Sequence, residues 1–251
     1  MNLSGNTILI TGGSSGIGLA MAEAFLAHGN EIAVCARRQD RLLAAQAKHP
    51  EILVRECNVG EQKDREALIE WVQSMLPRLN VLVNNAGIQR DIDFTSGAAQ
   101  FLSGESEIKI NLEAPIALSG MFVPQLAGKP GATIVNVSSG LGFVPSAKMP
   151  VYSATKAGIH AFTMALRKQV ERLGIRVVEV VPPAVDTELN PAGRAKRGGF
   201  RPVLSAATFV AAVMKGLESD AREIGYGTTI SSIHASRAEL DRAFEQMNSR
   251  T

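Results

Sequence analysis

The chain has 251 residues, of which 45% are hydrophobic and 20% charged, a composition typical of a globular protein with a substantial core. Its net charge of +2 does not indicate a nucleic-acid or membrane partner, and no apolar run reaches the roughly 18 residues of a bilayer-spanning helix. The N-terminus lacks the segments of a signal peptide, both cysteines lie in apolar runs, and the histidines show no metal-ligand spacing. We therefore expect a cytoplasmic protein without a metal.

Short apolar runs alternate with longer helical patterns, without an internal repeat or linker, so we expect a single domain over residues 1–251. Strands are predicted over Thr7–Thr11, Glu31–Ala36, Ile52–Asn58, Val81–Asn84, Ala132–Ser138, Ile175–Val181 and Arg222–Tyr226. Helices are predicted over Gly16–Ala27, Asp40–Lys48, Glu61–Met75, Glu105–Leu126, Val151–Leu173, Ser205–Leu217 and Ile233–Met247. This alternation indicates an α/β fold, a three-layer doubly wound sheet that is mostly parallel and covered by helices on both faces. The last helix is amphipathic, and we expect it to pack on the core, with partner binding as the alternative.

Polar or glycine-rich residues stand at the ends of six predicted strands. They are Gly12, Arg37, Asn58, Asn85, Ser139 and Thr187. In a doubly wound sheet, ligands bind beyond the carboxyl ends of the strands, so we expect these residues to form one site.

The first strand runs into a turn that contains Gly12, Gly16 and Gly18 and opens a helix. Glycine permits a positive φ and a close approach of the backbone to a ligand. The helix N-terminus attracts a pyrophosphate, and the hydroxyls of Ser14 and Ser15 can add donors. Because this turn follows the first strand of a βαβ unit, dinucleotide binding is favoured over an ordinary tight turn.

Tyr152 and Lys156 are spaced to share one face of a helix. Lowering a tyrosine pKa from about 10 to near neutrality requires roughly 4 kcal/mol. An ammonium at about 4 Å supplies about that much at an effective dielectric constant of about 20. The pair is therefore suited to proton transfer, although such a pair alone is more often an ordinary surface pair.

Several strings together resemble the short-chain dehydrogenase/reductase family over nearly the full length. They are Thr11-Gly12-x-x-x-Gly16-Ile17-Gly18, Asn84-Asn85-Ala86-Gly87, Asn111, Ser139 and Tyr152-x-x-x-Lys156. The resemblance implies a Rossmann fold with a seven-stranded sheet and a nicotinamide dinucleotide as cofactor. Within the family, the chain is similar to a bacterial branch of DltE-like oxidoreductases.

The resemblance also implies roles for four residues. Tyr152 would act as general acid and base, giving a proton to a carbonyl oxygen while NADPH delivers hydride to the carbon. Lys156 would lower the pKa of Tyr152 and bond the nicotinamide ribose, and Ser139, at the family's spacing from Tyr152, would bond the substrate oxygen. Asn111 would hold a water in a proton relay towards Lys156; the alternative is a polar residue that bends its helix.

Other cofactor contacts are implied by the same resemblance. The cofactor-binding residues are Gly12, Ser14, Ser15, Gly16, Ile17, Gly18, Arg37, Arg38, Asn58, Val59, Asn85, Ala86, Gly87, Tyr152, Lys156, Pro182, Val185 and Thr187. Asn58 and Val59 would hold the adenine, and Val185 and Thr187 would reach the carboxamide and phosphates. Pro183 stands where the family usually has glycine, which removes an N–H from this loop.

The end of the second predicted strand, Ala36-Arg37-Arg38, indicates which nicotinamide cofactor is used. An acidic residue there would repel a 2′-phosphate. The two guanidinium groups instead match phosphate geometry and favour NADP(H) over NAD(H). The alternative is that Arg37 and Arg38 only begin a solvated, charged helix with Asp40 and Arg41.

The substrate side is predicted to be apolar and covered by a lid over residues 188–202. The expected pocket residues between Ser139 and Tyr152 are Gly140, Leu141, Phe143, Met149 and Pro150. We expect a small-molecule carbonyl or alcohol substrate, and by analogy a homodimer through the helices near 105–126 and 151–173, with a tetramer as the alternative.

Two other functions compete with an oxidoreductase. A non-catalytic NADP(H)-sensing protein would need no proton donor, so the presence of Ser139, Tyr152 and Lys156 disfavours it. A sugar-nucleotide epimerase or dehydratase would have a different glycine spacing and a larger C-terminal part.

Overall fold

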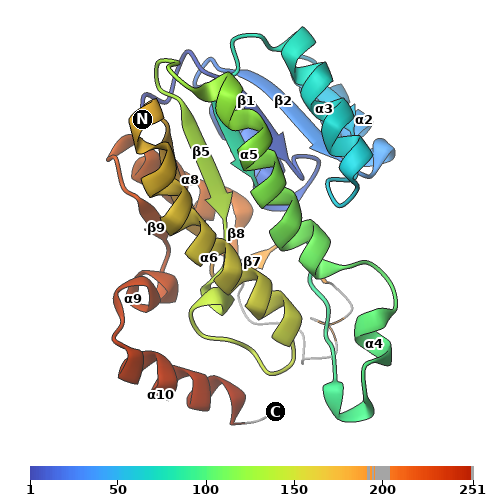
Figure 1. Ribbon diagram of the computed structural model, residues 1–251, viewed down its shortest axis with the longest axis vertical. Helices are drawn as coiled ribbons and strands as arrows, with labels where there is room; N and C mark the ends of the chain where they lie inside the picture. The colour runs from blue at the N-terminus through green and yellow to red at the C-terminus, as the bar shows by residue number, and fades with distance from the viewer. Residues whose placement is uncertain (191–192, 194, 196–203, 250–251) are drawn as a thin grey trace.

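The computed structural model describes residues 1–190, 193, 195 and 204–249. Its main sheet has seven parallel strands in the order β3-β2-β1-β4-β5-β6-β9 (Figure 1). The strands are β1 (Thr7–Thr11), β2 (Glu31–Ala36), β3 (Leu53–Glu56), β4 (Val81–Asn84), β5 (Thr133–Val137), β6 (Arg176–Val181) and β9 (Glu223–Gly225). All seven predicted strands are therefore confirmed, and the order reverses between β1 and β4, where doubly wound folds bind ligands.

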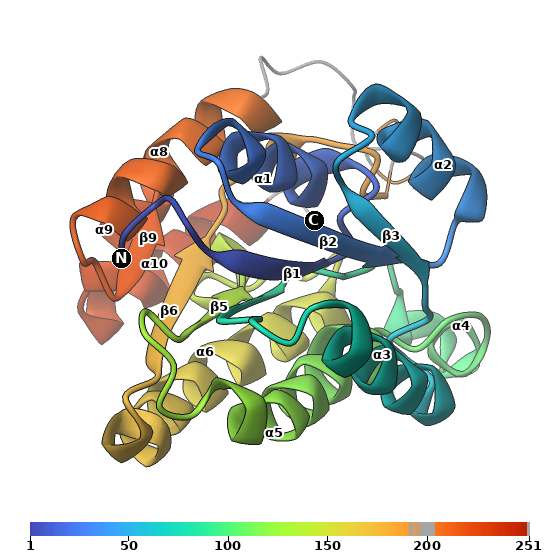
Figure 2. The ribbon, with the colours of Figure 1, turned by 90° about the horizontal axis from the view of Figure 1, so that it is seen from above.

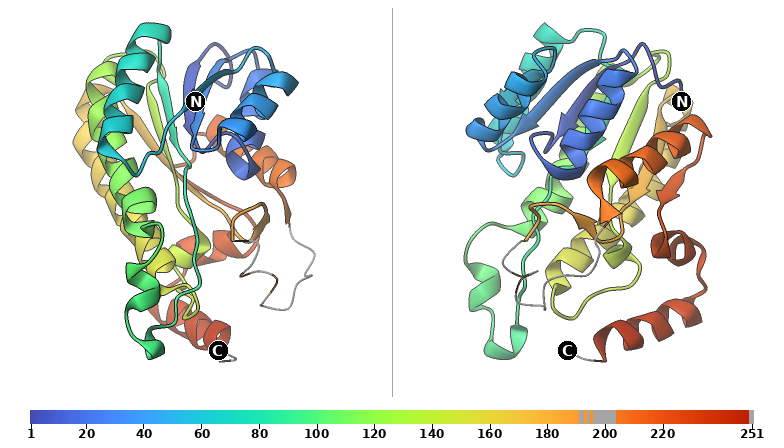
Figure 3. Two further views of the ribbon diagram at one scale, coloured as in Figure 1. Left: turned by 90° about the vertical axis from the view of Figure 1, so that its right-hand side faces the viewer. Right: turned by 180° about the vertical axis from the view of Figure 1, so that it is seen from behind.

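Helices cover both faces of this sheet (Figures 2 and 3). One layer is formed by α1 (Gly16–Ala27), α2 (Gln39–Lys48) and α8 (Ala206–Glu218), and the other by α3 (Gln62–Met75), α5 (Ala114–Leu126) and α6 (Pro150–Val170). Alternate residues of β1 enter the two cores: Ile8 and Ile10 pack on the α1 side and Leu9 on the α5 side. The predicted three-layer α/β fold is confirmed.

Several short elements were not predicted. They are the 3-10 turns Phe94–Ser96 and Gly140–Gly142, α4 (Ala99–Leu102), and the two-stranded pair β7 (Val185–Asp186) and β8 (Leu204–Ser205). The predicted helix over Val151–Leu173 ends in the 3-10 turn Glu171–Leu173. The predicted helix over Glu105–Leu126 is also irregular, because it begins with the π-helical turn Lys109–Glu113 before α5. Such π-turns often occur at functional sites.

The prediction of one continuous helix over Ile233–Met247 is wrong. The chain forms α9 (Thr228–His234), breaks, and restarts as α10 (Arg237–Asn248). The break has a local cause: the Ser236 hydroxyl accepts from the Glu239 N–H, while the Glu239 carboxylate accepts from the Ser236 N–H, a capping box that starts a new helix.

The expectation that this last helix packs on the core is also wrong, because no residue of α10 is buried. α10 lies below the sheet, at the bottom of the view in Figure 1. Asn248, the last residue of α10, hydrogen-bonds the loop before α6: its side chain accepts from the Ala147 N–H (2.8 Å) and donates to the Pro145 carbonyl (3.1 Å).

Three other expectations concern the cysteines, a membrane-spanning helix and the lid. Cys35 and Cys57 are buried and free, as predicted. Among the described residues, no helix combines the length and apolar character needed to cross a membrane. Most of the predicted lid over residues 188–202 lies outside the described residues.

Candidate active site

A cleft of about 1210 Å³ opens at the carboxyl ends of the strands. The predicted site residues that line it are Gly12, Ser14, Ser15, Gly16, Ile17, Arg37, Arg38, Val59, Asn85, Ala86, Gly87, Ser139, Tyr152, Lys156, Pro182, Val185 and Thr187. The fold therefore brings residues from six strand ends into one cleft. Gly18, Asn58 and Asn111 are not part of its lining.

The turn between β1 and α1 has the geometry that its glycines predict. Gly12 and Gly16 have φ values of +67° and +56°, and a Cβ on Gly12 would lie 2.8 Å from the Cα of Ala86. A Cβ on Gly18 would lie 2.4 Å from the Gly12 carbonyl oxygen. Gly18 is thus required for the turn to fold tightly under the cleft, and a side chain on Gly12 would meet the β4 end.

Asn85 connects the ends of β1 and β4. Its side-chain amide donates to the carbonyls of Thr11 (2.9 Å) and Gly12 (3.2 Å). The Thr11 hydroxyl in turn accepts from the backbone N–H groups of Asn85 (3.0 Å) and Ala86 (3.1 Å). These four hydrogen bonds fix the position of the glycine turn relative to the end of β4, which lies beside β1 in the sheet.

Ser139, Tyr152 and Lys156 meet in the inner part of the cleft. Tyr152 and Lys156 come from the first two turns of α6, and Ser139 follows β5. All three are buried, and the Lys156 Nζ lies 5.6 Å from the centroid of the Tyr152 ring. Nζ also donates to the Val137 carbonyl (2.8 Å), which places the ammonium at the end of β5.

The electrostatics of this group differ from the sequence-based expectation. Burial raises the pKa of Tyr152 to about 12, although its hydrogen bond with Ser139 acts in the opposite direction. Burial also lowers the pKa of Lys156 to about 8. The prediction that Lys156 brings the Tyr152 pKa towards neutrality therefore does not hold in the protein alone, because desolvation of the phenolate outweighs the hydrogen bond with Ser139 and the charge of Glu107 raises the pKa further.

Asn111 lies in the π-helical turn and is buried behind the cleft. Its Oδ1 accepts from the Ile88 N–H and its Nδ2 donates to the Ile88 carbonyl, both at 2.8 Å. A Cβ on Gly87 would lie 3.3 Å from the Asn111 Oδ1 and 3.8 Å from the Lys156 Nζ, so these two side chains approach each other across Gly87. Both readings of Asn111, relay residue and helix-distorting residue, fit this position.

The two arginines predicted to hold a 2′-phosphate are engaged by carboxylates. Arg37 pairs with Glu105, and Glu188 bridges Arg38 (3.0 Å) and Arg41 (2.8 Å). Arg38 also donates to the Ser15 hydroxyl (3.2 Å), at the glycine turn. The guanidinium groups thus lie beside the glycine turn. An anionic ligand that bound them would replace their ion pairs with Glu105 and Glu188.

The predicted adenine contact Asn58 and two of the predicted apolar pocket residues also do not line the cleft. The Asn58 Oδ1 accepts from the Gly60 N–H (3.1 Å) inside its own turn, so Val59 lines the cleft and Asn58 does not. Of the predicted apolar pocket residues, Phe143 and Pro150 lie outside the lining, and the Phe143 ring packs on His160 with 4.5 Å between ring centroids.

Other lining residues were missed. They are Ile88, Gln89, Arg90, Glu105, Ile110, Val144, Thr228, Thr229, Ser232, Ala243 and Met247, among others. The last two belong to α10, whose apolar face was visible in the sequence but was assigned to the core. Of the residues on that predicted face, Met247 lines the cleft, together with Ala243 of the same helix.

Comparisons with known proteins agree with this architecture. The model of the short chain dehydrogenase family matches residues 6–198. The chain is 44% identical over 248 residues to the uncharacterized oxidoreductase DltE of Bacillus subtilis (strain 168), covering 99% of this chain and 98% of that protein. It is 32% identical over 200 residues to the mouse (Mus musculus) 15-hydroxyprostaglandin dehydrogenase [NAD(+)], covering 75% and 71% of the two chains. Among solved structures, a short-chain dehydrogenase from Sphingobium yanoikuyae in complex with NADPH superposes with a TM-score of 0.81 at 28% identity, covering 98% and 96%.

Proposed function

This chain belongs to the short-chain dehydrogenase family and is a DltE-like, nicotinamide-dependent oxidoreductase of alcohol and carbonyl groups; from that premise we propose that it is an NADP(H)-dependent carbonyl reductase. Tyr152 is the proposed general acid and base. The observation that carries the proposal is the convergence of Ser139, Tyr152 and Lys156 in the cleft that begins at the glycine turn. A pure nucleotide sensor would not need a buried phenol beside a buried amine.

The residues present fit a dinucleotide. The positive φ values of Gly12 and Gly16 leave the turn without side chains where a Cβ would meet Ala86 and Thr187, and this turn opens the N-terminus of α1. We assign the pyrophosphate to this turn, the adenine to the side of Val59, and the nicotinamide end to Val185 and Thr187. When bound, the cofactor supplies the hydride, and the protein supplies orientation and the proton.

The proton chemistry favours reduction of a carbonyl. Because burial keeps the pKa of Tyr152 at about 12, the phenol is protonated at neutral pH, as a proton donor must be. Ser139 hydrogen-bonds the phenol and can also donate to the substrate oxygen, which fixes that oxygen near the Tyr152 hydroxyl. Lys156 in its ammonium form then stabilises the phenolate that remains after proton transfer.

This mechanism predicts the pH dependence of reduction. Lys156 has a pKa of about 8, so its ammonium, and with it the stabilisation of the phenolate, is lost above that pH. We expect kcat for reduction to be constant between about pH 6 and pH 7 and to fall up to tenfold per pH unit above about 8. Initial rates with saturating NADPH measure this profile. A Lys156→Arg variant keeps its positive charge, so its kcat should not fall above pH 8, whether or not the variant is slower than wild type. A fall of kcat with the wild-type midpoint in that variant would show that Lys156 does not cause the pH dependence.

The arginines beside the phosphate turn support NADP(H), and the Sphingobium relative with bound NADPH is consistent with that choice. The mouse relative, whose name specifies NAD(+), shows that the family does not decide the cofactor by itself. We expect Arg37→Asp to raise KM for NADPH by about 10- to 100-fold, the loss of one charge-assisted phosphate contact, without raising KM for NADH. Arg78→Asp, the same charge change on an exposed side chain outside the cleft lining, is the matched control. An unchanged NADPH-to-NADH preference in Arg37→Asp would contradict the assignment.

The experiment that tests the proposed function is a panel of ketones, aldehydes and secondary alcohols, followed by nicotinamide absorbance with each cofactor. Turnover of at least one carbonyl compound is expected. Tight NADPH binding without turnover of any compound would favour the sensing protein.

We further propose that the chain acts as a cytoplasmic single-domain homodimer. Ile116 on α5 and Met164 on α6 are 38% and 52% exposed, and both helices lie on the same outer layer of the sheet. Such apolar residues on neighbouring helices are suited to a self-complementary interface.

A further inference from the structure

A row of polar side chains crosses the sheet beneath α6. Asn84, Asn136, Glu179 and Glu223 are paired in register across β4, β5, β6 and β9. The Asn84 amide donates to the Asn136 Oδ1 (2.9 Å), and the Asn136 amide donates to the Thr163 hydroxyl of α6 (2.9 Å). The row therefore lies on the face of the sheet that carries α6, the helix of Tyr152 and Lys156.

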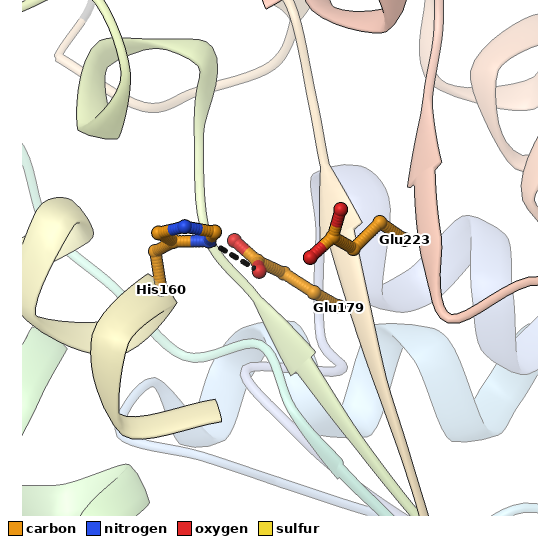
Figure 4. Close-up of side chains that lie close together, drawn as sticks. All are labelled: His160, Glu179 and Glu223. Carbon is orange, nitrogen blue, oxygen red and sulfur yellow. Dashed lines mark hydrogen bonds and ion pairs between the residues drawn. The ribbon is translucent and has the colours of Figure 1, made fainter. Parts of the chain in front are cut away.

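Glu179 is the buried charge in this row. Its exposed fraction is 0%, and a carboxylate in such a position requires a cationic partner. The partner is His160, whose Nδ1 lies 2.8 Å from the Glu179 Oε2 (Figure 4). This hydrogen bond raises the pKa of His160, which favours the charged imidazole.

This contact occupies one of the two carboxylate oxygens of Glu179. Its second oxygen, Oε1, is buried and has no hydrogen-bond partner among the described residues. Lys156 and His160 are one helical turn apart on α6 and both reach the sheet, Lys156 at Val137 on β5 and His160 at Glu179 on the adjacent strand. The carboxylate of Glu179 attracts the Lys156 ammonium and opposes the effect of burial on its pKa.

We propose that Glu179 is a positioning residue for the reductase: its buried carboxylate, held by His160, supplies the countercharge that keeps Lys156 in its ammonium form. The proposal rests on the proposed function for its effect on turnover, but the charge of Lys156 can be measured without turnover. Four charged or titratable groups face Glu179 or its partner His160. They are Lys156, His160 and Arg167 from α6 and Glu223 from β9.

The test is the titration of Lys156 in wild type and Glu179→Gln. Glutamine has the same shape and can still accept from His160, so the variant is expected to fold, which its thermal unfolding checks. In protein labelled with ¹³C at lysine Cε, the Lys156 signal, assigned with Lys156→Arg, should titrate near 8 in wild type. In Glu179→Gln the midpoint should fall by about one pH unit or more, because an opposite charge has been removed. At pH 8 that change lowers the protonated fraction from about one half to about one tenth.

Three further measurements separate this role from a merely structural one. Glu179→Asp keeps the charge and should bring the midpoint back towards the wild-type value, whereas Glu223→Gln, on the outer neighbouring strand, should leave it near that value. The alkaline limb of kcat should move with the Lys156 midpoint in each variant. His160, Glu179 and Glu223 offer ligand atoms within 4.8 Å of one another, so wild type is also titrated after dialysis against EDTA. An unchanged midpoint in Glu179→Gln would overturn the proposal. So would a wild-type midpoint that rises on EDTA treatment, because a bound cation would then neutralise the carboxylate in the untreated protein. Absence of turnover with a shifted midpoint would refute only the reductase.

Discussion

Replacing Tyr152 with phenylalanine should abolish carbonyl reduction while NADPH still binds. The substitution removes one hydroxyl from a buried ring that otherwise keeps its packing, so the fold and the cleft should persist. A positioned general acid contributes about 10²- to 10⁴-fold to rate, and we expect kcat to fall by at least that range. The Kd for NADPH, measured by fluorescence titration, should change by less than about threefold, since Tyr152 is one of many residues assigned to the cofactor and its hydroxyl is directed to the reacting oxygen.

The chain supplies a matched control for this substitution. Tyr226, the other tyrosine, packs edge-on against Phe209 and does not line the cleft. Tyr226→Phe should keep the wild-type rate. Substantial turnover by Tyr152→Phe, or an equal loss in both variants, would contradict the role of Tyr152.

Gly18→Ala should damage both stability and cofactor binding, although Gly18 is not in the cleft lining. Its new Cβ would lie 2.4 Å from the Gly12 carbonyl oxygen and 2.5 Å from the Asn85 Nδ2, and neither can move without shifting the turn. Overpacking of this kind costs about 1–3 kcal/mol, which for a chain of this size lowers Tm by about 2–12 °C. Because the displaced turn is the proposed pyrophosphate site, we expect the Kd for NADPH to rise about 100-fold.

Gly120→Ala is the control for helical glycines. Gly120 lies on the exposed side of α5, and a Cβ there meets nothing within 4 Å. Alanine is a better helix former than glycine, so Tm should stay the same or rise slightly.

The Gly18→Ala prediction would be contradicted by an NADPH affinity equal to that of wild type, which would show that the turn does not hold the phosphates.

Much of the fold could be predicted from the sequence because the central strands are short apolar runs. Residues Val81–Val83 and Val177–Val181 are nearly all apolar, and a strand buried on both faces has no regular polar alternation to confuse its assignment. The strand ends were equally predictable, since parallel order alone brings Gly12, Asn85 and Ser139 to one edge. The glycine turn, the Tyr152–Lys156 spacing and the choice of Ser139 needed only local sequence.

The features that were missed depend on long-range contacts or on competing local ones. Hydrophobic periodicity continued across Ser236, but the capping box with Glu239 ended one helix and began the next. The ion pair between Arg37 and Glu105 joins residues far apart in the sequence, which no local pattern records. Glu179 lies inside an apolar strand, and only the pairing of β6 with its neighbours shows that it faces His160 and α6.

The pKa of Tyr152 was misjudged for a physical reason. The sequence identified the neighbouring ammonium but not the depth of burial, and desolvation raises the pKa of this phenol more than the hydrogen bond with Ser139 lowers it. The same burial lowers the pKa of Lys156, which makes any countercharge near it important.

The central claim is that hydride passes from a bound nicotinamide to a carbonyl carbon beside Tyr152. The most direct measurement is reduction of a carbonyl compound from the panel with NADPH deuterated at one or the other face of C4, followed by mass spectrometry and NMR of the alcohol. We predict deuterium on the carbinol carbon with one of the two labelled cofactors, and loss of this transfer in Tyr152→Phe. An alcohol free of deuterium with both labelled cofactors, or undiminished transfer in Tyr152→Phe, would contradict the account.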